Sequence, residues 1–441
     1  MIELEHRFRT LAKHAFSTLT ADEVLLLNLE AEDSDFVRIN RARVRQSGHV
    51  RQQVLRLELI RDGRAARADL ALAGEDDTDA ARAVAMVGEL RELLPRLPED
   101  PYLHYATEPV NSRHEGDNRL PAAEEAVEHW LDAARGLDMA GIWSSGLISR
   151  GFANSLGQFN WHGDWSFNAD WSVHGGTDQA VKQHHAGFVF DPETVTRQLS
   201  EARETLALLA QTPRRLTPGR YRVYLAPSAV YELMSLLAWV GFGLKSHRTA
   251  QTPLIRMVRE GFQLDPRVNL SEDHAGGLAP RFTPEGFIKP QRVDLISQGR
   301  YRDCLAGARS AREYGETVNC ASERAESLDM DAGDLATDQV LSALGTGVYI
   351  SDLWYGNYSD RNHCRITGMT RFACLWVENG QPVAPVNPMR FDESLLHILG
   401  ERLEAITSER LHILENATYE KRSEISARLP GLLVDGFTFT L

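Results

Sequence analysis

Cysteine is scarce in this chain. Its four cysteines, Cys304, Cys320, Cys364 and Cys374, show no CxxC spacing. Cysteine-based metal sites usually contain such close pairs, and disulfide frameworks occur mainly in short secreted chains that are dense in cysteine. We therefore expect reduced thiols in a cytoplasmic protein, without a cysteine-based metal site.

Long hydrophobic runs and signal-peptide features are also missing. The most apolar run, YELMSLLAWVGFGLKS at residues 231–246, is too short to span a bilayer. The N-terminal stretch MIELEHRFRTLAKHAF predicts an amphipathic helix and lacks the apolar segment of a signal peptide. The sequence therefore predicts no membrane association.

Positive charge is in deficit as well. The chain carries 48 Lys and Arg against 62 Asp and Glu, which gives a formal net charge of −14. Proteins that bind nucleic acids in general gain affinity by neutralising phosphates with Lys and Arg, so we expect no nucleic-acid partner. The hydrophobic content of 43% and charged content of 25% are those of a globular protein.

Prolines divide the chain, which is too long for one ordinary hydrophobic core. Residues 94–109 carry several prolines and predict a linker, and Pro213 and Pro218 mark a second boundary. We expect an N-terminal α/β domain over residues 1–110, a central domain over 111–213 and a C-terminal domain over 214–441.

Hydrophobic periodicity predicts an α+β fold. Strands are expected near residues 24–30, 36–46 and 54–63, with a turn at 32–35 and a hairpin turn at Asp62–Gly63. Helices with capping signals are expected at 76–94, 121–136 and 191–213. Further helices are expected at 229–243, 301–313 and 392–416.

An aromatic segment, FNWHGDWSFNADWSVH at residues 159–174, alternates strictly between two kinds of side chain. This pattern predicts a β-ribbon with one aromatic face and one polar, solvated face. His162 and Asp164 are neighbours on the polar face and His174 follows downstream, so a metal site is conceivable, although no known ligand spacing is present. The pattern is typical of an ordinary sheet with one packed and one solvated face, and a surface that contacts a peptide or ligand is an alternative favoured over the metal site.

Catalytic motifs are not evident. The chain's one His-Glu pair, at 114–115, is followed by Asn118 and Arg119 where a zinc helix would carry its second histidine. GxSxG, GxxxxGK[ST] and GxGxxG are all absent from the sequence. The residues alone therefore indicate no catalytic constellation.

Several segments, in order along nearly the whole chain, together resemble the TldD/PmbA family, the family of the TldD–TldE metallopeptidase. The resemblance implies an α+β, multi-domain fold, with an N-terminal domain of strands plus helix followed by a larger mixed α/β C-terminal domain of TldD/PmbA type. The segments are DSDFVRINRARVRQ (33–46), GFANSLG (151–157), VDLISQGRYRDCLAGARSAREYG (293–315), LATDQVLSALGTGVYISDL (335–353) and WVENGQPVAPV (376–386).

The resemblance also identifies where a metal would be expected. Metal-bearing members carry H-E-x-x-x-H on a helix and a late Cys-Gly-Lys segment, and the glutamate acts on zinc-bound water. In this chain Tyr231 and Leu236 stand in place of the two histidines, Glu232 is retained, and residues 428–441 contain no Cys-Gly-Lys. The resemblance thus implies a core helix without zinc, an inactive Glu232 and no cofactor in this chain.

A second aromatic stretch, residues 351–376, contains Trp354, Tyr355 and Tyr358. It predicts either a recognition surface for a partner or peptide, or an internal sheet that packs aromatic side chains.

The resemblance implies the zinc-free subunit of a heterodimeric TldD–TldE-type metallopeptidase. A TldD-like partner would carry the zinc, and this chain would shape the cavity and help to bind unfolded or flexible peptides. Two alternatives remain: a stand-alone homodimeric peptide-binding protein without hydrolysis, and an independent metalloenzyme that uses the region of His162 and His174.

Overall fold

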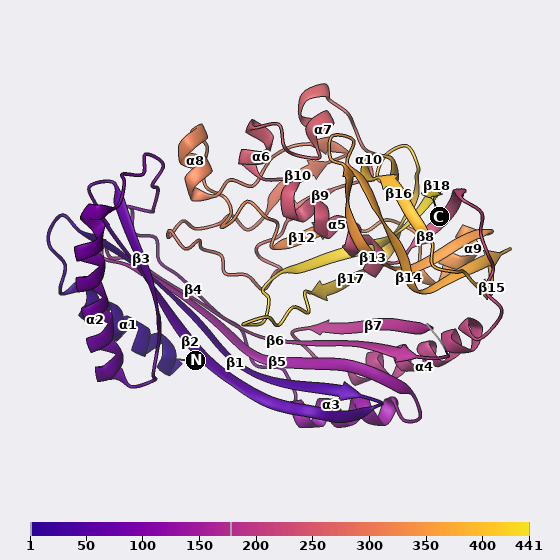
Figure 1. Ribbon diagram of the computed structural model, residues 1–441, viewed down its shortest axis with the longest axis horizontal. Helices are drawn as coiled ribbons and strands as arrows, with labels where there is room; N and C mark the ends of the chain where they lie inside the picture. The colour runs from indigo at the N-terminus through magenta and orange to yellow at the C-terminus, as the bar shows by residue number, and fades with distance from the viewer. Residues whose placement is uncertain (1, 177–178, 441) are drawn as a thin grey trace.

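The computed structural model describes residues 2–176 and 179–440 (Figure 1). The chain forms a seven-stranded sheet from its N-terminal half and an eleven-stranded sheet from its C-terminal half. The long N-terminal sheet runs along one side of the molecule, and the C-terminal body lies against it (Figure 1). This architecture confirms the predicted α+β fold class.

The N-terminal sheet has the strand order β3-β2-β1-β5-β6-β4, and β7 also pairs with β6. Strand β1 pairs with β5 from Leu26 to Ile39. Strands from residues 1–110 and 111–213 therefore share one sheet, and the proline-rich segment near residue 110 does not separate two sheets. The strands are β1 (Val24–Asn40), β2 (Arg43–Arg61), β3 (Arg64–Ala71), β4 (Ser112–Glu115), β5 (Asp138–Asn154), β6 (Phe159–His174) and β7 (Ala180–Gly187).

Four helices cover one face of this sheet. Helices α1 (Ile2–Phe16) and α2 (Asp76–Leu93) pack on leucines of β1 and β2, and α3 (Ala123–Ala133) and α4 (Pro192–Leu209) pack on aromatics of β5 and β6. Helix α4 begins as predicted, because the Asp191 carboxylate accepts a hydrogen bond from the backbone N–H of Glu193.

The predicted turns of the first strands have different outcomes. The hairpin turn at Asp62–Gly63 is confirmed, with φ of 50° and 68°. The turn expected at residues 32–35 is wrong, since β1 continues through them. These residues pair with β2 on one side and with β5 on the other, so two ladders of backbone hydrogen bonds outweigh their turn propensity.

The C-terminal sheet has the order β11-β10-β9-β12-β18-β16-β14-β13-β8, and β18 pairs with both β16 and β8. These last pairings close β18, β16, β14, β13 and β8 into a ring. The strands are β8 (Gly219–Leu225), β9 (Leu270–Glu272), β10 (Val293–Ser297), β11 (Arg300–Tyr301), β12 (Ser327–Met330), β13 (Gly347–Asp360), β14 (Arg365–Glu378), β15 (Gln381–Pro385), β16 (Arg390–Ser394), β17 (Leu403–Leu414) and β18 (Ser426–Phe439).

The helix predicted at 392–416 is wrong. Only α10 (Leu395–Ile398) forms there, and β17 follows it and pairs with β18. Register shifts in this pairing disturb the alternation of β17, so its apolar residues imitate helical spacing. The helix predicted at 301–313 is α8 (Ala308–Tyr314), preceded by β11. The other helical segments are α6 (Leu244–Arg248), α7 (Ile255–Glu260), α9 (Val340–Leu344) and the 3₁₀ turns Leu94–Arg96 and Thr337–Gln339.

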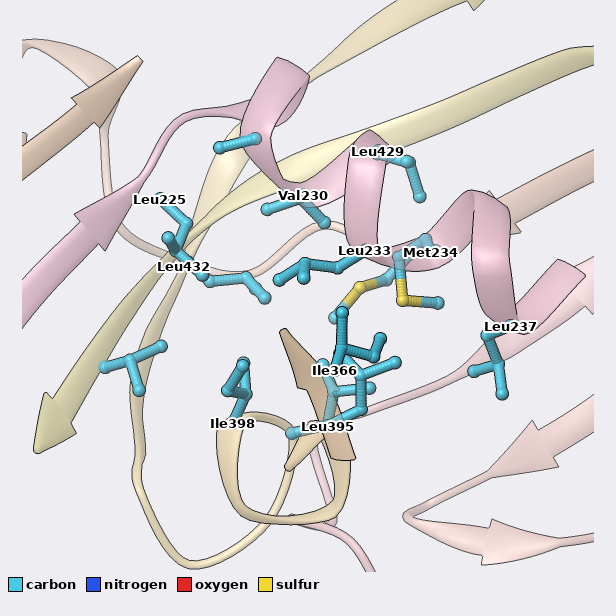
Figure 2. Close-up of a cluster of buried hydrophobic side chains, with 14 of the residues drawn as sticks. Leu225, Val230, Leu233, Met234, Leu237, Ile366, Leu395, Ile398, Leu429 and Leu432 are labelled. Atoms are coloured by element: carbon cyan, nitrogen blue, oxygen red, sulfur yellow. The ribbon is translucent and has the colours of Figure 1, made fainter. Parts of the chain in front are cut away.

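The apolar run at 231–246 lies largely in helix α5 (Pro227–Val240), which packs into the C-terminal core. Figure 2 shows Val230, Leu233 and Leu237 of α5 facing Ile366 and Leu395 from other elements. In the part of the chain that the structure describes, no helix is both long and apolar enough to cross a membrane.

Candidate functional site around helix α5

Helix α5 presents Tyr231, Glu232 and Leu236, the residues that the sequence singled out. Tyr231 and Leu236 are half-buried and pack against the C-terminal core. Among the described residues, no group of three His, Cys, Asp or Glu side chains at metal-ligand distance includes Glu232. A phenol and an isobutyl group offer zinc no ligand set of the usual kind.

Glu232 belongs to a charged cluster that the sequence did not predict. We call Asp170 of β6, Lys182 of β7, Glu232 of α5 and Asp352 of β13 the Lys182 cluster. The Lys182 Nζ lies 4.0 Å from the Asp352 Oδ2. The cluster therefore joins the N-terminal sheet to the C-terminal body.

Burial dominates the electrostatics of the Lys182 cluster. It raises the pKa of Asp352 to about 7, with Glu232 and Asp170 raising it further and Lys182 opposing. Burial also raises the pKa of Glu232 and of Asp170, again against the pull of Lys182. One ammonium cannot neutralise three carboxylates, so the cluster retains a proton as the pH approaches neutral.

The raised pKa of Asp352 predicts a pH dependence of stability. A carboxyl group with a higher pKa in the folded than in the unfolded state makes the free energy of unfolding fall as pH rises from about 4 to about 7. We expect Asp352→Asn to raise the free energy of unfolding at pH 8 by roughly 2–4 kcal/mol, and to have little effect near pH 4. Thermal unfolding of both proteins across this range measures the difference.

Asp360→Asn is the matched control, because Asp360 lies at the more exposed end of the same strand and pairs with His363, which lowers its pKa. It should not stabilise the protein at pH 8. If Asp352→Asn were less stable than the wild type at pH 8, the idea that burial raises the pKa of Asp352 would be contradicted.

The aromatic residues Trp354 and Tyr355 follow Asp352 on β13. Their exposed fractions are 51% and 79%, and Tyr355 has φ of 60° where the β13–β14 register shifts. The Arg371 guanidinium lies 5.3 Å from the Trp354 ring centroid. Tyr358, by contrast, packs against the C-terminal core. The stretch thus combines an exposed aromatic patch with packed sheet, and its role in partner or substrate contact stays a prediction.

His162 lies on the polar face of β6, and the expectation that this face is solvated is wrong. His162 is buried, and its Nε2–H donates to the carbonyl oxygen of Leu278 at 3.0 Å. Burial lowers the pKa of His162 to about 4. The C-terminal body covers this face, for example where the Asn168 side chain donates to the carbonyl oxygen of Leu414.

Asp164 has a neighbour that sequence reasoning missed. The Nε2 of His114 lies 2.9 Å from the Asp164 Oδ2, and the rings of His114 and His162 stack with centroids 4.9 Å apart. Strand β4 pairs in parallel with β6 and sets His114 opposite His162, a long-range pairing without a local signal. His174 lies at the exposed far end of β6, roughly 40 Å from His162 at the usual rise per residue, so these two do not share a site.

Because His162 is buried, its removal should destabilise the fold. We expect His162→Ala to cost about 1–3 kcal/mol, since it empties a packed site and leaves the Leu278 carbonyl without its donor. His174→Ala, at the exposed end of the same strand, should cost less than about 0.5 kcal/mol. Equal and small changes in chemical denaturation of the two variants would contradict the buried role.

A family model described as the PmbA/TldA metallopeptidase C-terminal domain matches residues 218–441. The chain therefore belongs to the TldD/PmbA family. A search of curated proteins finds no match.

Solved structures share the fold of nearly the whole chain. TldE from Thermococcus kodakarensis has a TM-score of 0.77 at 14% identity, covering 99% of this chain and 100% of its own. A proposed modulator of a DNA gyrase from Thermotoga maritima has a TM-score of 0.75 at 15% identity, with the same coverage. A second such protein, from Bacteroides thetaiotaomicron, has a TM-score of 0.71 at 16% identity, covering 100% of this chain and 99% of its own.

Proposed function

We propose that this chain is the zinc-free subunit of a heterodimeric metallopeptidase of TldD–TldE type. One feature supports the proposal: by the resemblance, Tyr231 and Leu236 of α5 stand in place of the zinc histidines while Glu232 is retained, and both side chains pack against the core. A glutamate without a metal-bound water has no nucleophile to activate. A TldD-like partner would therefore supply the zinc.

The substrates in this proposal are unfolded or flexible peptides, which this chain would help to hold in the cavity of the complex. The exposed Trp354 and Tyr355 are the best placed of the predicted residues for direct contact with a peptide or the partner. His162, Asp164 and Tyr358 would contribute by shaping the surfaces next to that cavity. Large aromatic side chains often carry much of the energy of such contacts.

Assembly with a partner tests this proposal. Size-exclusion chromatography with light scattering, on the chain alone and mixed with a TldD-like protein that carries H-E-x-x-x-H, should reveal a one-to-one complex. The same measurement on the Trp354→Ala and Tyr355→Ala variants tests whether these exposed aromatic side chains contribute to the one-to-one complex. A chain that forms a homodimer in the mixture and binds peptides without hydrolysis would instead favour the stand-alone peptide-binding protein.

A further inference from the structure

A cluster of candidate metal ligands lies away from α5, in the C-terminal body. Glu272 ends β9, His274 follows it by two residues, and Glu326 directly precedes β12. The side chains of Glu272 and His274 are 1% and 0% exposed, and that of Glu326 is 20% exposed. One ligand atom from each residue lies within 4.8 Å of the others.

The hydrogen bonds of His274 leave one ring nitrogen free. Its Nδ1 lies 2.8 Å from the carbonyl oxygen of Pro290, which only accepts, so Nδ1 carries the hydrogen. The Nε2 lone pair then points toward Glu272, 3.5 Å from its Oε1, without a hydrogen-bond partner among the described residues. Metal-binding histidines commonly donate their other ring N–H to a backbone carbonyl in this way.

Glu272 is held with one oxygen free. Its Oε1 accepts from the backbone N–H groups of Glu326 and Ser327, both at 2.9 Å. Its Oε2 is buried and has no partner within residues 2–176 and 179–440. Glu272 and His274, whose side chains approach to 3.5 Å, thus each keep one buried polar atom without a partner, and such unpartnered atoms cost free energy.

The formal charges around Glu272, His274 and Glu326 favour a bound cation. The buried Lys289 Nζ lies 2.8 Å from the Glu326 Oε2, so one ammonium accompanies the two carboxylates. Lys289 and Glu326 also line a cavity of about 480 Å³, which gives solvent and ions a path to the cluster. Other charged residues around that cavity include Arg150, Glu415 and Arg422.

We propose that Glu272, His274 and Glu326 bind one divalent first-row transition cation. Imidazole nitrogen and carboxylate oxygen together suit Mn²⁺, Fe²⁺ and Zn²⁺, and water from the cavity would complete the coordination. This site is separate from α5 and does not depend on the proposed heterodimer. The resemblance implied no cofactor in this chain, and the proposed site departs from that expectation at a position away from α5.

Metal titration of the full chain tests the proposal. After treatment with a chelator, Mn²⁺ should bind at one equivalent by calorimetry and by electron paramagnetic resonance, and Zn²⁺ should compete. Glu326→Gln and His274→Ala should each weaken Mn²⁺ binding at least about tenfold. Mn²⁺ should also raise the thermal midpoint of the wild-type chain and not that of Glu326→Gln.

Two matched controls separate this site from its surroundings. Glu415→Gln alters another carboxylate of the same cavity, and Glu232→Gln alters the Lys182 cluster; both should bind Mn²⁺ like the wild type. Glu326→Gln is the principal variant, because its partly exposed side chain makes it compatible with folding even if His274→Ala is not. Failure of the wild type to bind Mn²⁺ at millimolar concentration, or equal losses in Glu415→Gln and Glu326→Gln, would overturn the proposal.

Discussion

Mixing this chain with a zinc-bearing TldD-like partner is expected to raise peptide hydrolysis about a thousandfold over that of the chain alone. A bound metal ion contributes several kcal/mol by polarising the carbonyl and activating water, and about 4 kcal/mol corresponds to this factor. Helix α5 of this chain offers zinc no usual set of ligands, because the side chains of Tyr231 and Leu236 are a phenol and an isobutyl group that pack against the core. Turnover of an unstructured peptide by each chain and by the mixture measures the effect.

The control for this experiment is Glu232 itself. Glu232→Gln in this chain should leave turnover by the mixture essentially unchanged, because the catalytic glutamate belongs to the partner in this assignment. The equivalent change in the partner's H-E-x-x-x-H should abolish turnover. Loss of activity with Glu232→Gln here, in a complex that still assembles, would make Glu232 a catalytic residue and reverse the assigned roles.

Replacing Arg422 by methionine is expected to destabilise the protein by about 3–5 kcal/mol, a cost typical of breaking a buried charge network. Arg422 is 4% exposed, and burial lowers its pKa to about 10. Its guanidinium donates to the carbonyl oxygens of Gly146 at 3.2 Å and Ser166 at 2.9 Å, and so joins the segment before β18 to β5 and β6. The substitution would leave the buried Glu32 without its nearby positive charge.

Lys421→Met provides the neighbouring control. Lys421 pairs with Glu30, but these side chains are 44% and 35% exposed. Exposed ion pairs typically contribute less than about 1 kcal/mol, so the free energy of unfolding should change little. Comparable losses in the two variants during urea unfolding would show that Arg422 does not hold the two halves together through these buried hydrogen bonds.

The sequence alone determined the features that depend on neighbouring residues. The Asp62–Gly63 turn follows from the positive φ that these residues tolerate, and the start of α4 follows from the carboxylate cap of Asp191. The apolar spacing of residues 229–243 predicted a helix, and Leu233, Met234 and Leu237 of α5 are buried. The resemblance placed Tyr231 and Leu236 at the positions of the zinc histidines, and that assignment stays a prediction.

Tertiary structure decided the features that depend on distant residues. Pairing with β18 makes Leu403–Leu414 a strand although its apolar spacing predicted a helix, and pairing on both sides carries β1 through the predicted turn at 32–35. The polar face around His162 is buried because the C-terminal body packs on it. The contacting residues Leu278 and Leu414 lie more than a hundred residues further along the chain. Periodicity within one segment carries no information about what covers that segment, so the Lys182 cluster and the Glu272–His274–Glu326 cluster emerge only when separate strands are brought together.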